Sequence, residues 1–299
     1  MSIYDPELDG QTKHGRAISR IRSFCRGKKT LVAFSGGKDS QCCYHLCEEA
    51  GVPFTAQYSV TRFEPPELLR FIRENYPGVS FRRAYRRSLV EDIERRGPPS
   101  RWARWCCDAK HKATPGFDIA VVGVRAAESS KRAKTWREFG FKPDHSAYVC
   151  PIIDWTTEDV WEYLSSIGKP HCVLYDPPWN FRRIGCVCCP LASPAKMQRD
   201  AELWPKTAAM LRMGSDRFVQ RKRAHGWTNN NGKPCADWCK AESPEAEFWT
   251  RWITTGQVTM SQKDYKNAQD AKRGKAEGED APCLFAGTGF SESDGRGEE

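Results

Sequence analysis

The chain has 299 residues, of which 39% are hydrophobic and 28% are charged, so we expect a soluble globular protein. This length accommodates one large α/β domain with an appendage, or two modest domains. The longest apolar runs, at residues 30–34 and 119–124, are too short to cross a bilayer, and the first ten residues lack the apolar core of a secretory signal. We therefore expect a cytoplasmic location and no membrane partner.

The number of cysteines indicates which kinds of site to expect. Fourteen residues are cysteine, and without a secretory signal these thiols are expected to stay reduced. Clustered cysteines then favour metal binding or catalysis over disulfides.

The charge points to an anionic partner. The formal net charge is +9, and arginines are concentrated between Arg62 and Lys112. Such a stretch suits nucleic acid or a polyanionic small ligand, and an ordinary solvated basic face is the alternative.

Hydrophobic periodicity predicts strands that alternate with helices. In chain order we expect a helix at 12–28, a strand at 30–34, a helix at 40–50, a strand at 54–60, a helix at 67–76, a strand at 79–85, a helix at 88–95, strands at 118–124 and 147–153, and a helix at 157–167. This alternation indicates an α/β fold with an open, mostly parallel sheet and helices on both faces.

The C-terminal third changes character. After Pro190 the pattern is helical, with helices expected at 194–213, 215–225 and 243–253, and few apolar residues follow Gly256. We therefore predict a principal domain at 12–193, a small helical extension at 194–255 and a disordered tail at 256–299.

A polar, glycine-rich loop with the sequence SGGKDS follows the strand at 30–34 and precedes a helix. Its residues are Ser35, Gly36, Gly37, Lys38, Asp39 and Ser40. The two glycines permit close backbone approach, the N–H groups at the helix start can bind an anion, and Lys38 adds positive charge. Asp39 is a candidate ligand for Mg²⁺ beside bound phosphates. The spacings of the Walker loop and of GxGxxG are absent, and an ordinary strand-to-helix turn is the alternative.

This loop resembles the pyrophosphate loop (PP-loop) of the adenine-nucleotide alpha-hydrolase superfamily. That superfamily includes ATP pyrophosphatases, tRNA thiolation enzymes and phosphoadenosine phosphosulfate (PAPS) reductases. The resemblance implies a Rossmann-like nucleotide-binding domain, an adenine nucleotide with Mg²⁺ as ligand, and catalytic roles for Lys38 and Asp39.

Two tight cysteine groups stand far apart in the sequence. Cys106 and Cys107 are adjacent and are expected on a loop, whereas Cys186 and Cys189 form a CxxC pair within CVCC. Four such thiolates can bind zinc or a [4Fe–4S] cluster. Adjacent cysteines reach a single ion only with strain and suit a cubane with separate irons. Buried free thiols are the alternative.

The pattern WCC…CxxC resembles the iron–sulfur branch of the PAPS reductase family, of the adenylylsulfate reductase type, and the related DNA-phosphorothioation sulfur enzymes. The resemblance implies that Cys106, Cys107, Cys186 and Cys189 bind a [4Fe–4S] cluster. Cys188 leaves open which members of CVCC are ligands.

Further segments extend the resemblance over roughly residues 28–193. Residues 123–132 (GVRAAESSKR) resemble the family's GxRxxES…R loop at a strand end, where ligands bind in open α/β sheets. The segments PIIDW…DVW and LYD…RIGC match in the same way, although core packing explains their tryptophans well. By this resemblance the added nucleotide-binding residues are Lys110, Gly123, Arg125, Glu128 and Ser129, and Arg125 and Arg132 are catalytic phosphate or sulfate clamps.

One feature of the family's reductases is absent. No C-terminal ECGxH segment occurs, and the late cysteines are Cys235 and Cys239, which lie near His225 as a weak metal signal, and Cys283. We therefore predict an enzyme that acts at the α-phosphate of ATP or a PAPS-like nucleotide and uses the cluster in sulfur transfer. DNA or RNA is a candidate acceptor, and a sulfur or electron donor protein is a candidate partner. The alternatives are a PAPS or adenylylsulfate reductase that releases sulfite, and a nucleic-acid-binding accessory protein with a structural cluster.

Overall fold

The computed structural model describes residues 2–83, 85–111, 116–224 and 242–257. All of these residues belong to one unit within Met1–Met260. The helices and strands, in chain order, are α1 (Lys13–Cys25), β1 (Thr30–Ala33), α2 (Lys38–Ala50), β2 (Phe54–Val60), α3 (Pro66–Asn75), β3 (Ser80–Arg83), α4 (Leu89–Arg96), α5 (Trp105–His111), β4 (Ile119–Val121), η1 (Ala126–Glu128), α6 (Ser130–Thr135), β5 (Phe139–Phe141), β6 (Ala147–Val149), α7 (Thr157–Ser166), η2 (Val173–Tyr175), α8 (Pro194–Leu203), α9 (Pro205–Ala224) and α10 (Pro244–Thr255).

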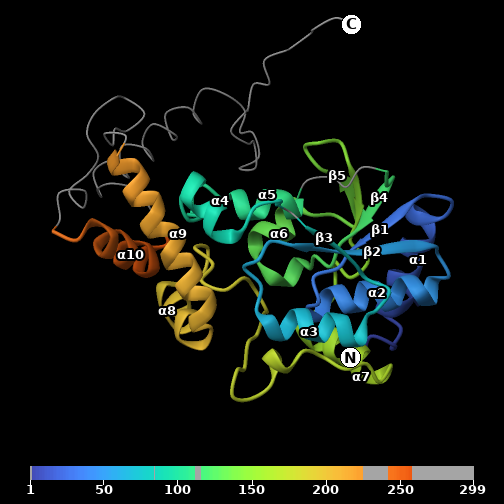
Figure 1. Ribbon diagram of the computed structural model, residues 1–299. Helices are drawn as coiled ribbons and strands as arrows, with labels where there is room; N and C mark the ends of the chain where they lie inside the picture. Colours follow the sequence, from blue (N-terminus) through green and yellow to red (C-terminus); the bar gives the residue numbers. More distant parts are fainter. Residues whose placement is uncertain (1, 84, 112–115, 225–241, 258–299) are drawn as a thin grey trace, which may run out of the picture. The chain divides into compact units, whose positions relative to one another are not determined.

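The strands form a six-stranded sheet in the order β3-β2-β1-β4-β6-β5. Every neighbouring pair is parallel except β5 with β6, which is antiparallel. The predicted open, mostly parallel sheet is therefore confirmed. Figure 1 shows α1, α2, α3 and α7 on one side of the sheet and α4, α5 and α6 on the other, as the alternation of strands and helices predicted.

Helix α2 lies at the centre of the core. Its inner face buries Cys42, Cys43, Leu46 and Cys47, each at most 1% exposed, against β1, α1 and α7. Full burial of a side chain as large as leucine stabilises the folded state by about 1.5–3 kcal/mol. This packing fixes the start of α2, and with it the loop that precedes the helix.

The strand order creates a switch point beside β1. The chain proceeds from β1 outward to β2 and β3, then returns to place β4 on the other side of β1. In open α/β sheets ligands bind at the carboxyl ends of strands at such a point. Residues 35–40 and the segment after β4 both emerge there.

Several element boundaries differ from the sequence prediction. Cys106 and Cys107 lie on the short helix α5, so the expected loop is wrong; burial of Trp105 at 7% exposure holds this segment against the core. The predicted helix at 194–213 divides at Trp204, because the residue before Pro205 is disfavoured in the helical region. Gly214 lies within α9 and allows close packing on α4, because a Cβ there would lie 2.8 Å from Cβ of Ile93.

Helices are present in the C-terminal region as expected, and α9 packs on α4 and α10. The division at residue 193 stays a prediction, and the predicted tail falls almost wholly outside the described residues. Within the ranges the structure covers, no helix is both long and apolar enough to cross a membrane.

Candidate functional site

The loop at residues 35–40 is shaped by glycine. Gly36 has φ +73°, and a Cβ there would lie 2.7 Å from Cδ1 of Ile72 and 2.8 Å from Cδ1 of Leu68. Gly37 is the N-cap of α2 and has no side chain to cap the helix, although the first N–H group, that of Lys38, donates to the hydroxyl of Tyr175. Such N–H groups and the helix dipole favour a bound anion.

Two serines brace the same loop. The hydroxyl of Ser40 accepts a hydrogen bond from the N–H of Ser35 at 3.1 Å and donates to the carbonyl of Gly37 at 2.8 Å. The Ser35 hydroxyl lies 3.1 Å from that of Ser40 and is exposed. Ser40 therefore shapes the loop from inside, and Ser35 is the serine presented to solvent.

A carboxylate between two cations lies at the switch point. Asp39 accepts from Nε of Arg125 at 2.6 Å through Oδ1 and pairs with Nζ of Lys38 at 3.1 Å through Oδ2. The side chains of Lys38 and Arg125 are only 4% and 3% exposed. Buried cations of this kind need an anion nearby, and Asp39 supplies it.

The segment after β4 approaches α2 closely. A Cβ at Gly123 would lie 2.8 Å from the carbonyl oxygen of Asp39, so only glycine allows this contact. Arg125, two residues later, also donates to the carbonyl of Trp155 at 3.3 Å and to Oγ1 of Thr157 at 3.4 Å. The guanidinium is thus fixed by three neighbouring elements.

The remaining predicted residues of this segment lie beside Arg125. Glu128 accepts from the N–H of Arg125 at 3.2 Å, pairs with Arg132, and lies 3.5 Å from Arg183. Ser129 caps α6 through the N–H of Arg132. Burial, followed by the charge of Arg183, lowers the pKa of Arg132. This cluster of arginines around one carboxylate is suited to phosphate or sulfate.

Tyr175 is a residue of this site that sequence reasoning did not single out. Its hydroxyl accepts a hydrogen bond from the backbone N–H of Lys38 at 3.0 Å, and Nζ of Lys38 lies 5.9 Å from the ring centroid. Burial raises the pKa of Tyr175, so the hydroxyl stays neutral at physiological pH. The available signal is its place in LYD, a segment that resembles the family.

The two cysteine groups influence one another. Cys106 and Cys107 have their Sγ atoms 3.9 Å apart. The pKa of Cys106 is raised first by its hydrogen bond with Cys107, then by burial, and then by the charges of Cys107, Cys186 and Cys189. Among the described side chains, no three cysteine, histidine or acidic groups converge tightly enough for a metal ion. The four predicted ligands are therefore neighbours without forming a compact single-ion site.

Cys188 faces a different part of the molecule. It is 1% exposed, has φ +51°, and its Sγ lies 3.5 Å from the carbonyl of Met197 on α8. Its N–H donates to Oδ2 of the buried Asp200 at 3.1 Å. Cys186, Cys189 and Cys107 are partly exposed. Of the CVCC thiols, Cys188 is the one directed into the helical core.

Phe63 connects the two cysteine segments. Its carbonyl accepts from the N–H of Val187 at 2.6 Å, and its ring lies 5.7 Å from that of Trp105. Arg96 in turn lies over the ring of Trp105 at 5.5 Å. Phe63, in the segment after β2, therefore contacts both Trp105, which precedes Cys106, and Val187, which follows Cys186.

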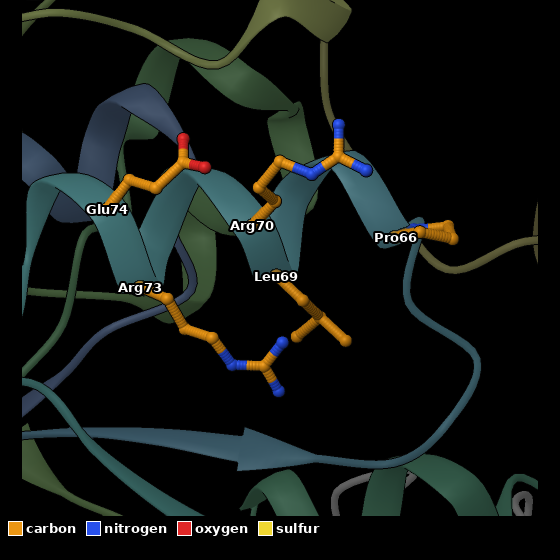
Figure 2. A pocket seen from close by; sticks show the side chains of 5 residues that line it. All are labelled: Pro66, Leu69, Arg70, Arg73 and Glu74. Carbon is orange, nitrogen blue, oxygen red and sulfur yellow. The ribbon is translucent and has the colours of Figure 1, made fainter.

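A shallow hollow of about 340 Å³ lies on the outer face of α3. Figure 2 shows its lining, which consists of Pro66, Leu69, Arg70, Arg73 and Glu74. The side of α3 that meets the phosphate loop is instead formed by Leu68 and Ile72. This hollow is therefore separate from the loop at residues 35–40.

Some predicted residues fall outside the described part of the chain. The backbone of Lys110 lies on α5, but its side chain is not among those that the structure describes. His225, Cys235, Cys239 and Cys283 lie outside the described residues altogether. Their roles stay predictions.

The model of the phosphoadenosine phosphosulfate reductase domain family matches residues 29–192. An uncharacterized protein of Methanocaldococcus jannaschii, MJ0066, is 30% identical over 194 residues, covering 60% of this chain and 40% of that protein. An adenosine 5'-phosphosulfate reductase of Staphylococcus epidermidis is 29% identical over 137 residues, covering 42% of this chain and 54% of that protein. The chain thus spans about half the length of the curated relatives it matches.

Among solved structures, the phosphoadenylyl-sulfate (PAPS) reductase from Candida auris, in a phosphate complex, is similar with a TM-score of 0.41 and 14% identity. That match covers 57% of this chain and 87% of the other.

Proposed function

Because the chain belongs to the phosphoadenosine phosphosulfate reductase domain family, a family of PP-loop enzymes, we propose that it binds an adenine nucleotide at residues 35–40 and acts at its α-phosphate. The observation that carries this proposal is the placement of Lys38, Asp39 and Arg125 together where β1 and β4 end. Two buried cations beside a helix N-terminus form a strong anion site.

Charge exchange explains how the site would accept a nucleotide. A phosphate that reaches Lys38 and Arg125 competes with Asp39 for both cations, because each pairs with one of its carboxylate oxygens. Asp39 then has oxygens available for Mg²⁺, which prefers such hard ligands next to phosphates. The cations would stabilise negative charge on the phosphates as pyrophosphate leaves the α-phosphate of ATP.

The cysteine groups support a [4Fe–4S] cluster held by Cys106, Cys107, Cys186 and Cys189. The donor set is four thiols from two segments, of which Cys106 and Cys107 are adjacent, and the charges of Cys186 and Cys189 act on Cys106. A four-iron cluster takes each thiolate at a separate iron, which suits adjacent cysteines better than a single zinc ion. When bound, such a cluster would supply sulfur or electron-transfer chemistry, while Cys188 stays with α8.

A single stretch of chain connects the nucleotide and cysteine sites. Tyr175 touches the phosphate loop at Lys38, and Arg183 lies 3.5 Å from Glu128 in the segment after β4. Cys186 follows Arg183 by three positions in RIGC. Sulfur transfer between the two sites is therefore the reaction class that this arrangement favours.

An exposed basic surface favours nucleic acid as the sulfur acceptor. Its exposed arginines lie on β3, α4 and the connecting segments and comprise Arg83, Arg86, Arg87, Arg95, Arg96 and Arg101. Trp102 is 38% exposed beside Arg101, and Arg96 lies over the rings of Tyr85 and Trp105. An exposed ring among arginines is typical of single-strand nucleic-acid binding, and Trp102 is such a ring, whereas Trp105 is buried.

A second candidate is reduction of adenylylsulfate or PAPS with release of sulfite. It is favoured by relatives that are adenosine 5'-phosphosulfate reductases, such as the Staphylococcus saprophyticus protein, which is 26% identical over 211 residues. That route needs a further thiolate to attack the substrate sulfur. The residues available for it are Cys235, Cys239 and Cys283, which lie outside the described ranges.

The deciding experiment is a nucleotide panel. Anaerobic protein is incubated with ATP and Mg²⁺, and separately with adenylylsulfate or PAPS and a dithiol, and pyrophosphate, AMP and sulfite are measured. We expect pyrophosphate or AMP from ATP, lost in Lys38→Ala and unaffected by Cys283→Ser. Sulfite formed at a catalytic rate and lost in Cys239→Ser or Cys283→Ser would establish the reductase instead. No turnover of any nucleotide, with nucleic-acid binding lost in Arg86→Ala/Arg87→Ala, would indicate an accessory protein.

A further inference from the structure

A chain of buried polar side chains leads from the phosphate loop toward solvent. Nε2 of Gln41 donates to the carbonyl of Gly36 at 3.2 Å, and Oε1 of Gln41 accepts from the Tyr76 hydroxyl at 2.9 Å. That hydroxyl lies 3.2 Å from Nε2 of His45, whose Nδ1 lies 2.7 Å from the carboxylate of Glu48. Gln41, Tyr76 and His45 are 0%, 3% and 6% exposed, and the Glu48 side chain is 50% exposed.

The direction of every hydrogen bond in this chain follows from its first member. A backbone carbonyl only accepts, so the amide of Gln41 must present its NH₂ group to Gly36 and its oxygen to Tyr76. Tyr76 then donates its one proton to Gln41 and must accept from His45 through Nε2–H. The carbonyl of Gly36 therefore selects the tautomer of His45 through Gln41 and Tyr76.

Charged groups lie at the His45 end of this series of hydrogen bonds. Glu48, Glu49 and Lys169 are the charged groups that influence His45, and burial outweighs the two carboxylates to lower the pKa of His45. In the neutral ring Nε2–H still faces Tyr76 and Nδ1 has no proton, so the 2.7 Å hydrogen bond to Glu48 belongs to the protonated ring, which carries both N–H groups. Both protonation states of His45 can thus hold Tyr76 in its donor orientation.

The orientation of the Gly36 carbonyl matters because of peptide geometry. In a trans peptide the C=O of Gly36 and the N–H of Gly37 point in opposite directions. With its carbonyl held by Gln41, the Gly36–Gly37 peptide aims the Gly37 N–H away from the core. Gly36 adopts φ +73° and has no Cβ to restrict its backbone, so a hydrogen bond to its carbonyl limits the rotation of the peptide that follows.

We propose that Gln41 is a positioning residue for the phosphates of the nucleotide, and that Tyr76 and His45 fix the orientation of its amide. By holding the Gly36 carbonyl, the chain pre-orients the next N–H group toward the anion and reduces the ordering that binding requires. This inference rests on the proposed nucleotide site at residues 35–40.

The first test removes one hydroxyl. Tyr76→Phe keeps the ring but leaves the amide of Gln41 without its donor, and Tyr44→Phe is the matched control. Tyr44 packs in the same ring cluster, 5.3 Å from Tyr76 and 5.2 Å from His45, and its hydroxyl is not part of the chain. Calorimetry with ATP and Mg²⁺ should give a Kd about three- to tenfold weaker in Tyr76→Phe, the loss expected for one hydrogen bond, and unchanged in Tyr44→Phe.

The second test is a pH profile that loss of packing alone would not produce. In Gln41→Glu, an ionised carboxylate would repel the Gly36 carbonyl, whereas the protonated acid can donate to it and still accept from Tyr76. The ratio of the variant's Kd to that of the wild type, measured at each pH from 9 to 6, should therefore fall as the pH falls. A constant ratio would contradict the proposal, and this test also decides the matter if Tyr76→Phe lowers the melting temperature.

The measurements distinguish an error in the nucleotide site from an error in the role of Gln41. If the wild type does not bind ATP, or Lys38→Ala binds it equally well, the nucleotide site itself is wrong. If the wild type binds and Lys38→Ala does not, but Tyr76→Phe matches Tyr44→Phe and the Gln41→Glu ratio is flat, the nucleotide site stands and the positioning role of Gln41 is overturned.

Discussion

Nε of Arg125, just beyond β4, lies 2.6 Å from Oδ1 of Asp39 in the first turn of α2. This contact joins the two strand ends that meet where the sheet reverses its strand order. It also brings a carboxylate, a lysine and an arginine into one buried group at a helix N-terminus. The proposed nucleotide chemistry depends on this group.

Removal of the lysine charge should abolish tight nucleotide binding. Lys38→Ala takes away a cation that is 4% exposed and faces the proposed phosphate position. We expect the Kd for ATP with Mg²⁺ to rise about ten- to a hundredfold, as for loss of a charge-assisted hydrogen bond. Calorimetry measures this, with Lys206→Ala on the exposed side of α9 as the control. Equal affinities in the two variants would place the nucleotide elsewhere.

Arg125 should not be replaceable by lysine. Its guanidinium contacts Asp39, Trp155 and Thr157 at once, a geometry that a single ammonium cannot reproduce. Arg125→Lys should therefore weaken nucleotide binding and lower the free energy of unfolding by about 1–3 kcal/mol, because buried acceptors lose their donors. Urea unfolding and calorimetry report the two effects. Full activity and wild-type stability in Arg125→Lys would refute the proposed clamp.

Much of this fold could be predicted from local patterns. The apolar run at 30–34 followed by glycines gave the strand, the loop and the start of α2 close to where they lie. The short edge strand β5 and helix α6 were missed, because three and six residues carry too little periodicity to detect. The break predicted after residue 213 lies instead at Trp204, before Pro205, and Gly214 lies inside α9, where a Cβ would come 2.8 Å from Cβ of Ile93.

The site was harder to predict than the fold. Lys38, Asp39 and Arg125 were chosen separately from sequence, and their meeting depends on β1 and β4 being neighbours. The contact of Tyr175 with Lys38, and that of Tyr76 with Gln41, join residues far apart in the sequence and depend on tertiary packing, so no sequence spacing indicated them. The orientation of Cys188 toward α8 likewise depends on its backbone at φ +51°.

Asp159 should contribute stability that depends on pH. Burial acts to raise its pKa, but hydrogen bonds from Lys13 and from the N–H of Thr156 outweigh burial and lower the pKa below its ordinary value of 3.8. The group therefore stabilises the fold above about pH 4, and this contribution is lost as the pH falls through the lower, folded-state value. Asp159→Asn should reduce the free energy of unfolding at pH 7. The difference from the wild type should shrink toward pH 3 in urea titrations, and a difference independent of pH would contradict the assignment.

The proposed cluster ligands can be separated from the neighbouring thiol. In anaerobically purified protein we expect about four irons and four acid-labile sulfides per chain, as in a cubane. Cys106→Ser and Cys186→Ser should lose most of the iron, whereas Cys188→Ser should keep it, because that thiol faces Met197. Stoichiometric zinc without sulfide, or loss of iron in Cys188→Ser alone, would overturn the ligand assignment.

We propose that the nucleotide loop and the cysteine groups form one reaction site, joined by the segment from Tyr175 to Cys186. The visible absorption spectrum of the anaerobic protein, recorded during titration with ATP and Mg²⁺, tests this proposal. We expect a saturable spectral change in the wild type, at the concentrations where calorimetry shows binding, and no change in Lys38→Ala. A cluster spectrum that stays constant while the wild type is saturated with nucleotide would contradict it.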